Sequence, residues 1–479
     1  MDFTERGRSM FIGREKELAT LERLYRKQEF QFPAIYGRRR VGKTTLISRF
    51  VRDKPTGFFT AIEGNLPANL RLLSAAIRAF EAPDVDPSSA PVYRDLYEAL
   101  DTVFRMAASQ QLVFVIDEYP YLAKADPSVS SMLQGLIDRY RDGSQLYLIL
   151  CGSSLSFMKE QLLDDKSPLY GRRTAQIELA PFDFFDALGF FPGVPATDAL
   201  QYYAMAGGVP LYLRQFDSSL SLEENVCEVF LQPESLLYDE PTNLIKQEVQ
   251  KAAPFNAVIQ AIAEGRSQNN EIATAVGIQT SELTYYLKGL CSIGLVGKEM
   301  PVAAGSRRAV YRLSDSLFRF WYRFVLPNRT AIERGMQQRV LRSVQMGLPA
   351  FCGPVFEDVC AQWLWRQNAD GSLPVEFGDL GRWWGNDPQL HEEAEIDLVG
   401  VDDGRTVLVG ECKWRNEELD GDVVDTLEHR SGLVHAQADS WLYAFSKSGF
   451  SQGAVEAAAC YGRMRLVSFD EMCASGTGH

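Results

Sequence analysis

The chain has 479 residues, of which 46% are hydrophobic and 23% charged, so it is too long for one ordinary domain and too apolar for a disordered protein. Its formal net charge of −14 argues against a protein that coats nucleic acid nonspecifically, although it leaves room for a local basic groove. No apolar run approaches the ~18 residues that span a bilayer, and the chain starts without an apolar signal region. We therefore expect a cytoplasmic protein with no membrane partner.

The cysteines favour a reducing compartment. The eight cysteines are scattered, no two of them form a CxxC pair, and only four histidines are present to complete a zinc set. Isolated thiols usually behave as small buried hydrophobes. We expect reduced cysteines without a structural metal.

The first 180 residues alternate short apolar runs with longer helical patterns, which is typical of an open parallel α/β sheet. Five runs predict five strands, at residues 32–37, 57–62, 111–117, 145–152 and 175–180.

A phosphate-binding loop follows the first of these strands. The stretch GRRRVGKTT fits GxxxxGK[ST] and opens a helix, so its backbone N–H groups are expected to surround a phosphate at a helix N-terminus. Lys43 would reach the β- and γ-phosphates of ATP, and the Thr44 hydroxyl would bind Mg²⁺. The predicted nucleotide-binding residues of the loop are Gly37, Arg38, Arg39, Arg40, Val41, Gly42, Lys43, Thr44 and Thr45.

Further polar residues follow the third and fourth predicted strands or precede the fifth. Asp117 and Glu118 end a buried strand, so we expect Asp117 to face Mg²⁺ and Glu118 to orient or deprotonate the attacking water. Ser153 follows the next strand and is expected to sense the γ-phosphate, with Ser154 as the second choice and ordinary loop chemistry as the alternative. Either Arg172 or Arg173 would serve as an arginine finger, or the pair belongs to a surface salt bridge.

The middle of the chain reads as helical. Gly207, Gly208 and Pro210 are expected to interrupt a helical lid. A helix at 270–276, a turn through Gly277, a second helix with Thr280 as N-cap and two strands then predict a winged helix-turn-helix. Its second helix and wing would offer a modest basic surface to DNA, or the module packs on the ATPase as a relay; the outward residues are Ser281, Thr284, Tyr285, Lys288, Arg307 and Arg308.

The last part of the chain places acids on a predicted hairpin. Strands at 395–401 and 405–414 would bring Asp397 opposite Glu411 and Lys413, which alternation puts on one face. Asp397 and Glu411 would bind Mg²⁺ against a scissile phosphate, Lys413 would orient the attacking water, and Glu357 on a preceding helix would complete the metal site. A cross-strand ion pair is the structural alternative.

These motifs resemble two known families. FIGREKEL, the P-loop, VIDEYPYL, LILCGSS, SPLYGRR and GGVPLYL occur in the order seen in the archaeal-type AAA+ ATPases, a group similar to the STAND signalling ATPases. That resemblance implies the strand order 5-1-4-3-2, adenine packing near Ile12, Gly13 and Arg14, and nucleotide contact by the lid at Gly208 and Pro210. The C-terminal hairpin resembles the PD-(D/E)xK nucleases, although the proline of that name is absent.

Four domains are therefore predicted in an α/β chain: an ATPase core (1–181), a helical lid (182–250), a winged helix (251–328) and a nuclease-like domain (329–479). Two functions fit this organisation. One is an ATP-gated enzyme that processes nucleic acid, DNA more than RNA; the other is an ATP-driven regulatory switch in which the nuclease fold is an inactive scaffold. An arginine finger that acted between subunits would imply a homo-oligomer.

Overall fold

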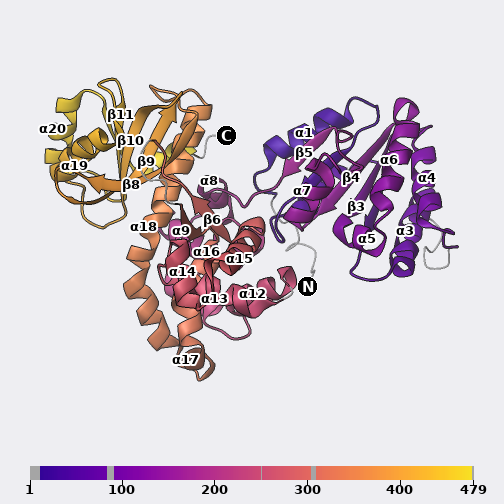
Figure 1. Ribbon diagram of the computed structural model, residues 1–479, viewed down its shortest axis with the longest axis horizontal. Coiled ribbons are helices and arrows are strands. Elements are labelled where there is room, and N and C mark those ends of the chain that lie inside the picture. Colours follow the sequence, from indigo (N-terminus) through magenta and orange to yellow (C-terminus); the bar gives the residue numbers. More distant parts are fainter. Residues whose placement is uncertain (1–10, 83–90, 250, 304–308, 477–479) are drawn as a thin grey trace. The chain divides into compact units, whose positions relative to one another are not determined.

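The computed structural model describes residues 11–82, 91–249, 251–303 and 309–476 (Figure 1). They form two compact units. The first contains the described residues up to Pro181 and the short segment Val209–Leu211, and the second contains Phe182–Gly208 and the described chain from Tyr212 onward. Among the helices of the described ranges, none has the combined length and apolarity needed to cross a membrane.

The first unit is built on a parallel sheet of five strands in the order β2-β3-β4-β1-β5, which confirms the expected order read from the opposite edge. The strands are short, apolar and almost wholly buried at the centre, as expected for a sheet covered on both faces. Their bounds are β1 Pro33–Tyr36, β2 Thr56–Thr60, β3 Leu112–Asp117, β4 Leu146–Gly152 and β5 Ala175–Glu178.

Helices cover both faces of this sheet. Alternation along β3 sends Val113 and Val115 into one cluster with α1 and α2, and Phe114 and Ile116 into another with the remaining helices. The three-layer arrangement leaves the carboxyl ends of β1, β3 and β4 side by side. The helices are α1 Glu15–Tyr25, α2 Lys43–Val51, α3 Leu66–Glu81, α4 Leu96–Met106, α5 Tyr119–Ala125, α6 Val129–Tyr140, η2 Arg141–Gly143 and α7 Leu155–Leu163.

The second unit begins with helices. The predicted break after α9 is confirmed, because α9 ends at Ala206 and the next helix starts at Pro210. Gly208 is required there, since a Cβ on it would lie 1.8 Å from the Phe182 carbonyl oxygen. The helices are α8 Phe184–Ala187, η3 Leu188–Phe190, α9 Ala196–Ala206, α10 Pro210–Leu213, α11 Leu222–Phe230 and α12 Leu236–Glu248.

The first part of the predicted winged helix, over the described residues 251–303 and 309–313, contains three helices and a two-stranded antiparallel sheet. Thr280 was predicted as the N-cap of the last helix, but the N-cap is Gln279 and Thr280 is the first helical residue. Arg307 and Arg308 lie outside the described residues. The elements are α13 Ala252–Ala263, α14 Asn269–Val276, α15 Thr280–Ser292, β6 Val296–Glu299 and β7 Val310–Leu313.

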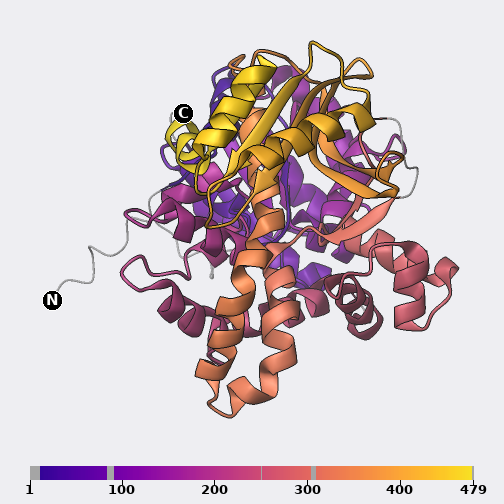
Figure 2. The ribbon, with the colours of Figure 1, turned by 90° about the vertical axis from the view of Figure 1, so that its left-hand side faces the viewer.

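A 33-residue helix, α18 (Gln337–Ala369), follows these elements and runs into the C-terminal sheet domain (Figures 1 and 2). The sequence predicted only its last part, around FEDVCAQWLW. The helix contains Pro349 and Pro354, which normally end a helix and so conceal its length. The short elements before it are α16 Ser316–Phe320, η4 Trp321–Val325, η5 Leu326–Asn328 and α17 Arg329–Glu333.

The C-terminal sheet is mixed, in the order β12-β11-β10-β9-β8. The predicted β9–β10 hairpin is confirmed, whereas β8 and β12 were not predicted. Residues of α19 and α20 share a hydrophobic cluster with one face of the sheet, and α18 packs against β9 and β10. The elements are β8 Asp379–Asp387, β9 Glu392–Asp402, β10 Arg405–Lys413, α19 Gly421–Ser431, η6 Gly432–Val434, β11 Trp441–Ser446, α20 Gln452–Tyr461, β12 Met464–Ser468 and α21 Phe469–Gly476.

Candidate functional site

The glycine-rich loop lies between the end of β1 and the start of α2. Gly42 has φ +93°, a left-handed conformation that glycine adopts without strain, and a Cβ on Gly37 would lie 2.3 Å from the Leu179 carbonyl oxygen. The Lys43 ammonium donates to the carbonyl oxygens of Gly37 and Arg38, both at 2.9 Å. Two carbonyl oxygens of the loop thus bind the ammonium of the loop's own lysine.

Lys43 is almost fully buried, and this burial lowers the pKa of its ammonium, while Glu118 and Asp117 oppose that effect. An anion in the loop would favour the charged form of the lysine. Of the other loop residues, Arg39 donates to the Tyr121 hydroxyl at 2.7 Å, Val41 is a core residue, and Thr45 is exposed.

The predicted acid pair lies at the end of β3, beside the loop. The Thr44 hydroxyl is 3.3 Å from a carboxylate oxygen of Asp117. The other oxygen of Asp117 accepts the backbone N–H of Glu118 at 3.0 Å. Two hard oxygen donors therefore meet at the helix N-terminus, and such donors suit Mg²⁺.

Glu118 is held in an unusual backbone conformation, with φ 52°, between β3 and α5. Its carboxylate accepts the Ser153 hydroxyl at 2.8 Å and the Ser153 backbone N–H at 3.3 Å. The structure therefore brings together the predicted base and the predicted sensor. Ser154, the second choice for the sensor, is instead the N-cap of α7, and its side chain forms no capping hydrogen bond there.

The two predicted arginine fingers lie elsewhere in the first unit. Arg172 makes a bidentate ion pair with Asp138, at 2.7 and 2.8 Å, and Arg173 donates to the Leu162 carbonyl oxygen. Within the ranges that the structure describes, neither guanidinium hydrogen-bonds to the P-loop or to the acid pair. The contacts of Arg172 match the alternative prediction for this pair, a surface salt bridge.

The segment predicted to contact adenine lies against the P-loop. Gly13 and Arg14 both have positive φ values, and Arg14 donates to the carbonyl oxygens of Ala180 at 2.6 Å and Val41 at 3.3 Å. Ile12 is half-buried. The ring of Pro210 lies 3.8 Å from the position of a Cβ on Gly42.

The C-terminal hairpin places Asp397 and Glu411 on adjacent strands. The β9–β10 register pairs Leu398 with Gly410, and Asp397 and Glu411 are the residues adjacent to this pair on the two strands. Asp397 accepts the Cys412 backbone N–H at 2.8 Å. Its burial and the charges of Glu411 and Glu357 raise its pKa to about 7.

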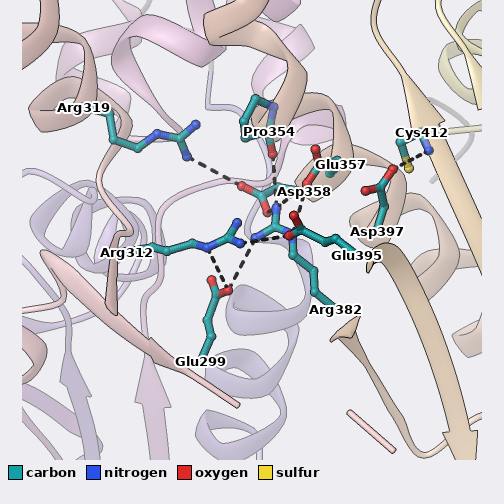
Figure 3. Close-up of polar contacts among 10 residues, drawn as sticks. All are labelled: Glu299, Arg312, Arg319, Pro354, Glu357, Asp358, Arg382, Glu395, Asp397 and Cys412. Atoms are coloured by element: carbon teal, nitrogen blue, oxygen red, sulfur yellow. Dashed lines mark hydrogen bonds and ion pairs between the residues drawn. The ribbon is translucent and has the colours of Figure 1, made fainter. Parts of the chain in front are cut away.

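The other two acids of this predicted metal set, Glu411 and Glu357, form ion pairs with lysine or arginine. Lys413 is in direct contact with Glu411, and Arg430 of α19 lies 3.3 Å from both carboxylate oxygens of Glu411. Arg382 of β8 pairs with Glu357 at 2.9 Å and with Asp358 at 3.0 Å (Figure 3). Among the described residues, no group of three or more His, Cys, Asp or Glu side chains is arranged to hold a metal ion. Sequence reasoning missed both arginines: Arg382 lies on a strand that was not predicted, and Arg430 reaches Glu411 only through the packing of α19 on the sheet.

The residues proposed to face DNA lie on α15. Ser281, Thr284, Tyr285 and Lys288 are all exposed, and Tyr285 retains 68% of its accessible surface. An exposed aromatic ring beside polar groups is suited to contact a partner.

Two family models match parts of the chain. Residues 11–216 match a family described as an "ATPase domain predominantly from Archaea". Residues 321–424 match one described as "Archaea bacterial proteins of unknown function". A Walker-type ATPase of Pyrococcus abyssi has a similar fold, with a TM-score of 0.51 and 18% identity over 66% of this chain and 97% of that one.

Two curated proteins of Methanocaldococcus jannaschii are similar in sequence. An uncharacterised ATP-binding protein is 47% identical over 45 residues, which are 9% of this chain and 76% of that protein. An uncharacterised protein is 30% identical over 410 residues, which are 85% of this chain and 88% of the relative. With the matched ATPase domain, this extended similarity shows that the chain belongs to the archaeal ATPase family.

Proposed function

We propose that the chain hydrolyses ATP with Mg²⁺ at the P-loop and couples this reaction to nucleic acid. The observation that carries the proposal is a set of contacts at the carboxyl ends of the strands: Lys43 on the loop carbonyls, Thr44 beside Asp117, and Ser153 on Glu118. These are the parts that phosphoryl transfer requires, because catalysis there is mainly positioning and charge stabilisation.

Each residue has a distinct task in this proposal. Lys43 exchanges its contacts with the loop carbonyls for phosphate oxygens, and Thr44 and Asp117 hold Mg²⁺, which supplies positive charge against the phosphates. Glu118 orients the attacking water and accepts its proton, while Ser153 holds the Glu118 carboxylate. The N-terminal segment 12–14 and the lid residues Gly208 and Pro210 contact the nucleotide, as the family resemblance implies.

The test is ATP hydrolysis by the full chain, with and without duplex DNA, single-stranded DNA and RNA. Hydrolysis should disappear in Lys43→Ala and in Glu118→Gln, and ATP should still bind to Glu118→Gln. Turnover that survives in both variants would remove the proposal. Separate Arg172→Ala and Arg173→Ala variants test the arginine-finger role, and mass measurement with ATP tests whether oligomers form.

A winged helix is proposed for residues 251–328, with α15 as the helix that contacts DNA. Support comes from the helix-turn-helix order, the antiparallel β6–β7 pair and the exposed residues of α15. A gel shift with duplex DNA tests it: Lys288→Gln should weaken binding, and an unchanged shift would count against α15.

For residues 329–479 we propose a nuclease-like fold, in which Asp397, Glu411 and Glu357 hold Mg²⁺ and Lys413 orients the attacking water. The approach of Asp397 to Glu411 on the hairpin supports it. Mg²⁺-dependent cleavage should be lost in Lys413→Ala while ATP hydrolysis survives. Failure to cleave any DNA or RNA in any nucleotide state would exclude this activity.

A second candidate is an ATP-driven regulator whose C-terminal domain is a scaffold. The ion pairs of Arg382 with Glu357 and of Arg430 with Glu411 favour it, because they neutralise two of the acids that a metal would need. In that case Asp397→Ala leaves function unchanged, and Lys43→Ala abolishes ATP-dependent assembly or DNA binding.

A further inference from the structure

An arginine-rich cavity lies in the second unit, beside the predicted C-terminal metal set, because Arg382 lines the cavity and pairs with Glu357 of that set. It has a volume of about 600 Å³ and its walls come from the end of α13, the β6–β7 pair, the α16–η4 turn, α18 and β8. This volume is in the range of small-molecule sites. Five arginines line it, against two carboxylates, in a chain with a net charge of −14; they are Arg266, Arg312, Arg319, Arg323 and Arg382.

Two of these arginines belong to a structural ion network. Arg382 pairs with Glu357, Asp358 and Glu299, and Arg312 pairs with Glu299 at 3.4 Å and Glu395 at 3.2 Å (Figure 3). The network joins β6 and β7 to β8, β9 and α18. The four carboxylates are thus committed mainly to Arg312 and Arg382.

The remaining three arginines lack comparable partners. The closest carboxylate to Arg319 is that of Asp358, at 3.8 Å, and this carboxylate is also bound by Arg382 at 3.0 Å. In the part of the chain that the structure describes, the Arg319 guanidinium makes no hydrogen bond, and Arg266 and Arg323 form neither a side-chain hydrogen bond nor an ion pair. Arg266 and Arg323 are exposed at the cavity.

Burial lowers the pKa of Arg319, and the neighbouring Arg382 and Arg312 lower it further, although Asp358 acts in the opposite direction. Each guanidinium has five N–H donors in a planar fork. The Arg319 fork is largely buried and has few acceptors, so an anion would stabilise it most, and phosphate oxygens match the geometry of all three forks.

We propose that this cavity binds the phosphate group of a nucleotide, either free or within a nucleic-acid strand, through Arg266, Arg319 and Arg323. The site is separate from the P-loop and requires no ATP hydrolysis. If the source is a strand, the cavity places its backbone beside β6–β7 and α18, and in that case the inference rests on the proposed coupling to nucleic acid.

The test uses the full chain in a Lys43→Ala background, which removes the phosphate contact proposed for Lys43. The cavity variant is Arg266→Gln/Arg323→Gln; both residues are exposed, so folding is expected to be unaffected. The control, Arg71→Gln/Arg139→Gln, removes two exposed arginines from α3 and α6 of the first unit. Probes are a fluorescein-labelled 12-nucleotide single strand, followed by anisotropy, and inorganic pyrophosphate, followed by titration calorimetry.

For a strand, the cavity variant should bind on the order of tenfold more weakly at low salt, and the slope of log K against log salt should shrink by about 1.4, since each single-strand phosphate contact contributes about 0.7. Loss of pyrophosphate binding alone would assign the site to free nucleotides. If both probes bind the cavity variant as they bind the control, the inference is overturned. ATP hydrolysis, measured with Lys43 intact, should be equal in both variants, so failure of the cavity and failure of the proposed ATPase are distinguishable.

Discussion

Ser153→Ala tests whether Ser153 positions the proposed base Glu118. The substitution removes a 2.8 Å hydrogen bond from a buried hydroxyl to a carboxylate. A hydrogen bond to a charged group contributes about 1.5–3 kcal/mol. The Ser153 backbone N–H remains 3.3 Å from the same oxygen, so we expect a loss near the lower end of this range.

A loss of about 1.5 kcal/mol corresponds to a slightly more than tenfold decrease in kcat. The KM for ATP should change little, because Ser153 acts through Glu118 and not on the phosphate-binding loop. Steady-state ATP hydrolysis, measured with a coupled assay over a range of ATP concentrations, separates the two parameters.

Two further variants make this test specific. Ser153→Thr keeps the hydroxyl and should recover most of the rate, whereas Ser154→Ala, at the neighbouring position, should match the wild type. The reasoning would be refuted if Ser153→Ala hydrolysed ATP at the wild-type rate while Glu118→Gln was inactive. A rise in KM without a change in kcat would instead support direct contact between Ser153 and the nucleotide.

Other predictions concern stability and pH. Gly208→Ala should lower the free energy of unfolding by about 3 kcal/mol, because its Cβ would overlap the Phe182 carbonyl. Gly135→Ala on α6, where a Cβ meets nothing within 4 Å, should be neutral or stabilising. Equal thermal shifts of the two variants would contradict this. Arg382→Gln should lower the free energy of unfolding, measured with urea, by about 3–5 kcal/mol, because Glu357 and Asp358 lose their main cation. Arg405→Gln removes an exposed ion pair and should lower it by under about 1 kcal/mol. The pKa of Asp397 is raised to about 7 in the folded chain, so its carboxyl loses its proton at a lower pH in the unfolded chain than in the folded one. The wild type should therefore lose stability relative to Asp397→Asn between about pH 4 and pH 7, by at most about 1.4 kcal/mol per pH unit, and a difference that is constant with pH would disprove the shift.

Local patterns were sufficient to predict the nucleotide-binding half. GRRRVGKTT and VIDEYP each join a strand to a helix, and strand-end residues of a parallel sheet meet at one edge whatever the loop lengths are. For this reason Lys43, Thr44, Asp117, Glu118 and Ser153 were expected together. The hairpin around Asp402–Gly404 was likewise predictable, because alternation and a turn signal are local properties.

Partners that depend on tertiary packing were not predictable. Arg382 lies on β8, whose sequence DLGRWWGND has glycine at two positions and little alternation, so neither the strand nor its ion pairs with Glu357 and Asp358 were expected. Arg430 reaches Glu411 only because α19 returns over the sheet. The length of α18 was concealed by Pro349 and Pro354, which tertiary packing tolerates inside the helix.

Binding of ATP by the purified full chain, measured by calorimetric titration with and without Mg²⁺, tests the nucleotide site most directly. We predict Mg²⁺-dependent binding that is lost in Lys43→Ala, and strongly reduced dependence on Mg²⁺ in Asp117→Asn. Binding that was equal with and without Mg²⁺, or unchanged in Lys43→Ala, would contradict the assignment of these residues.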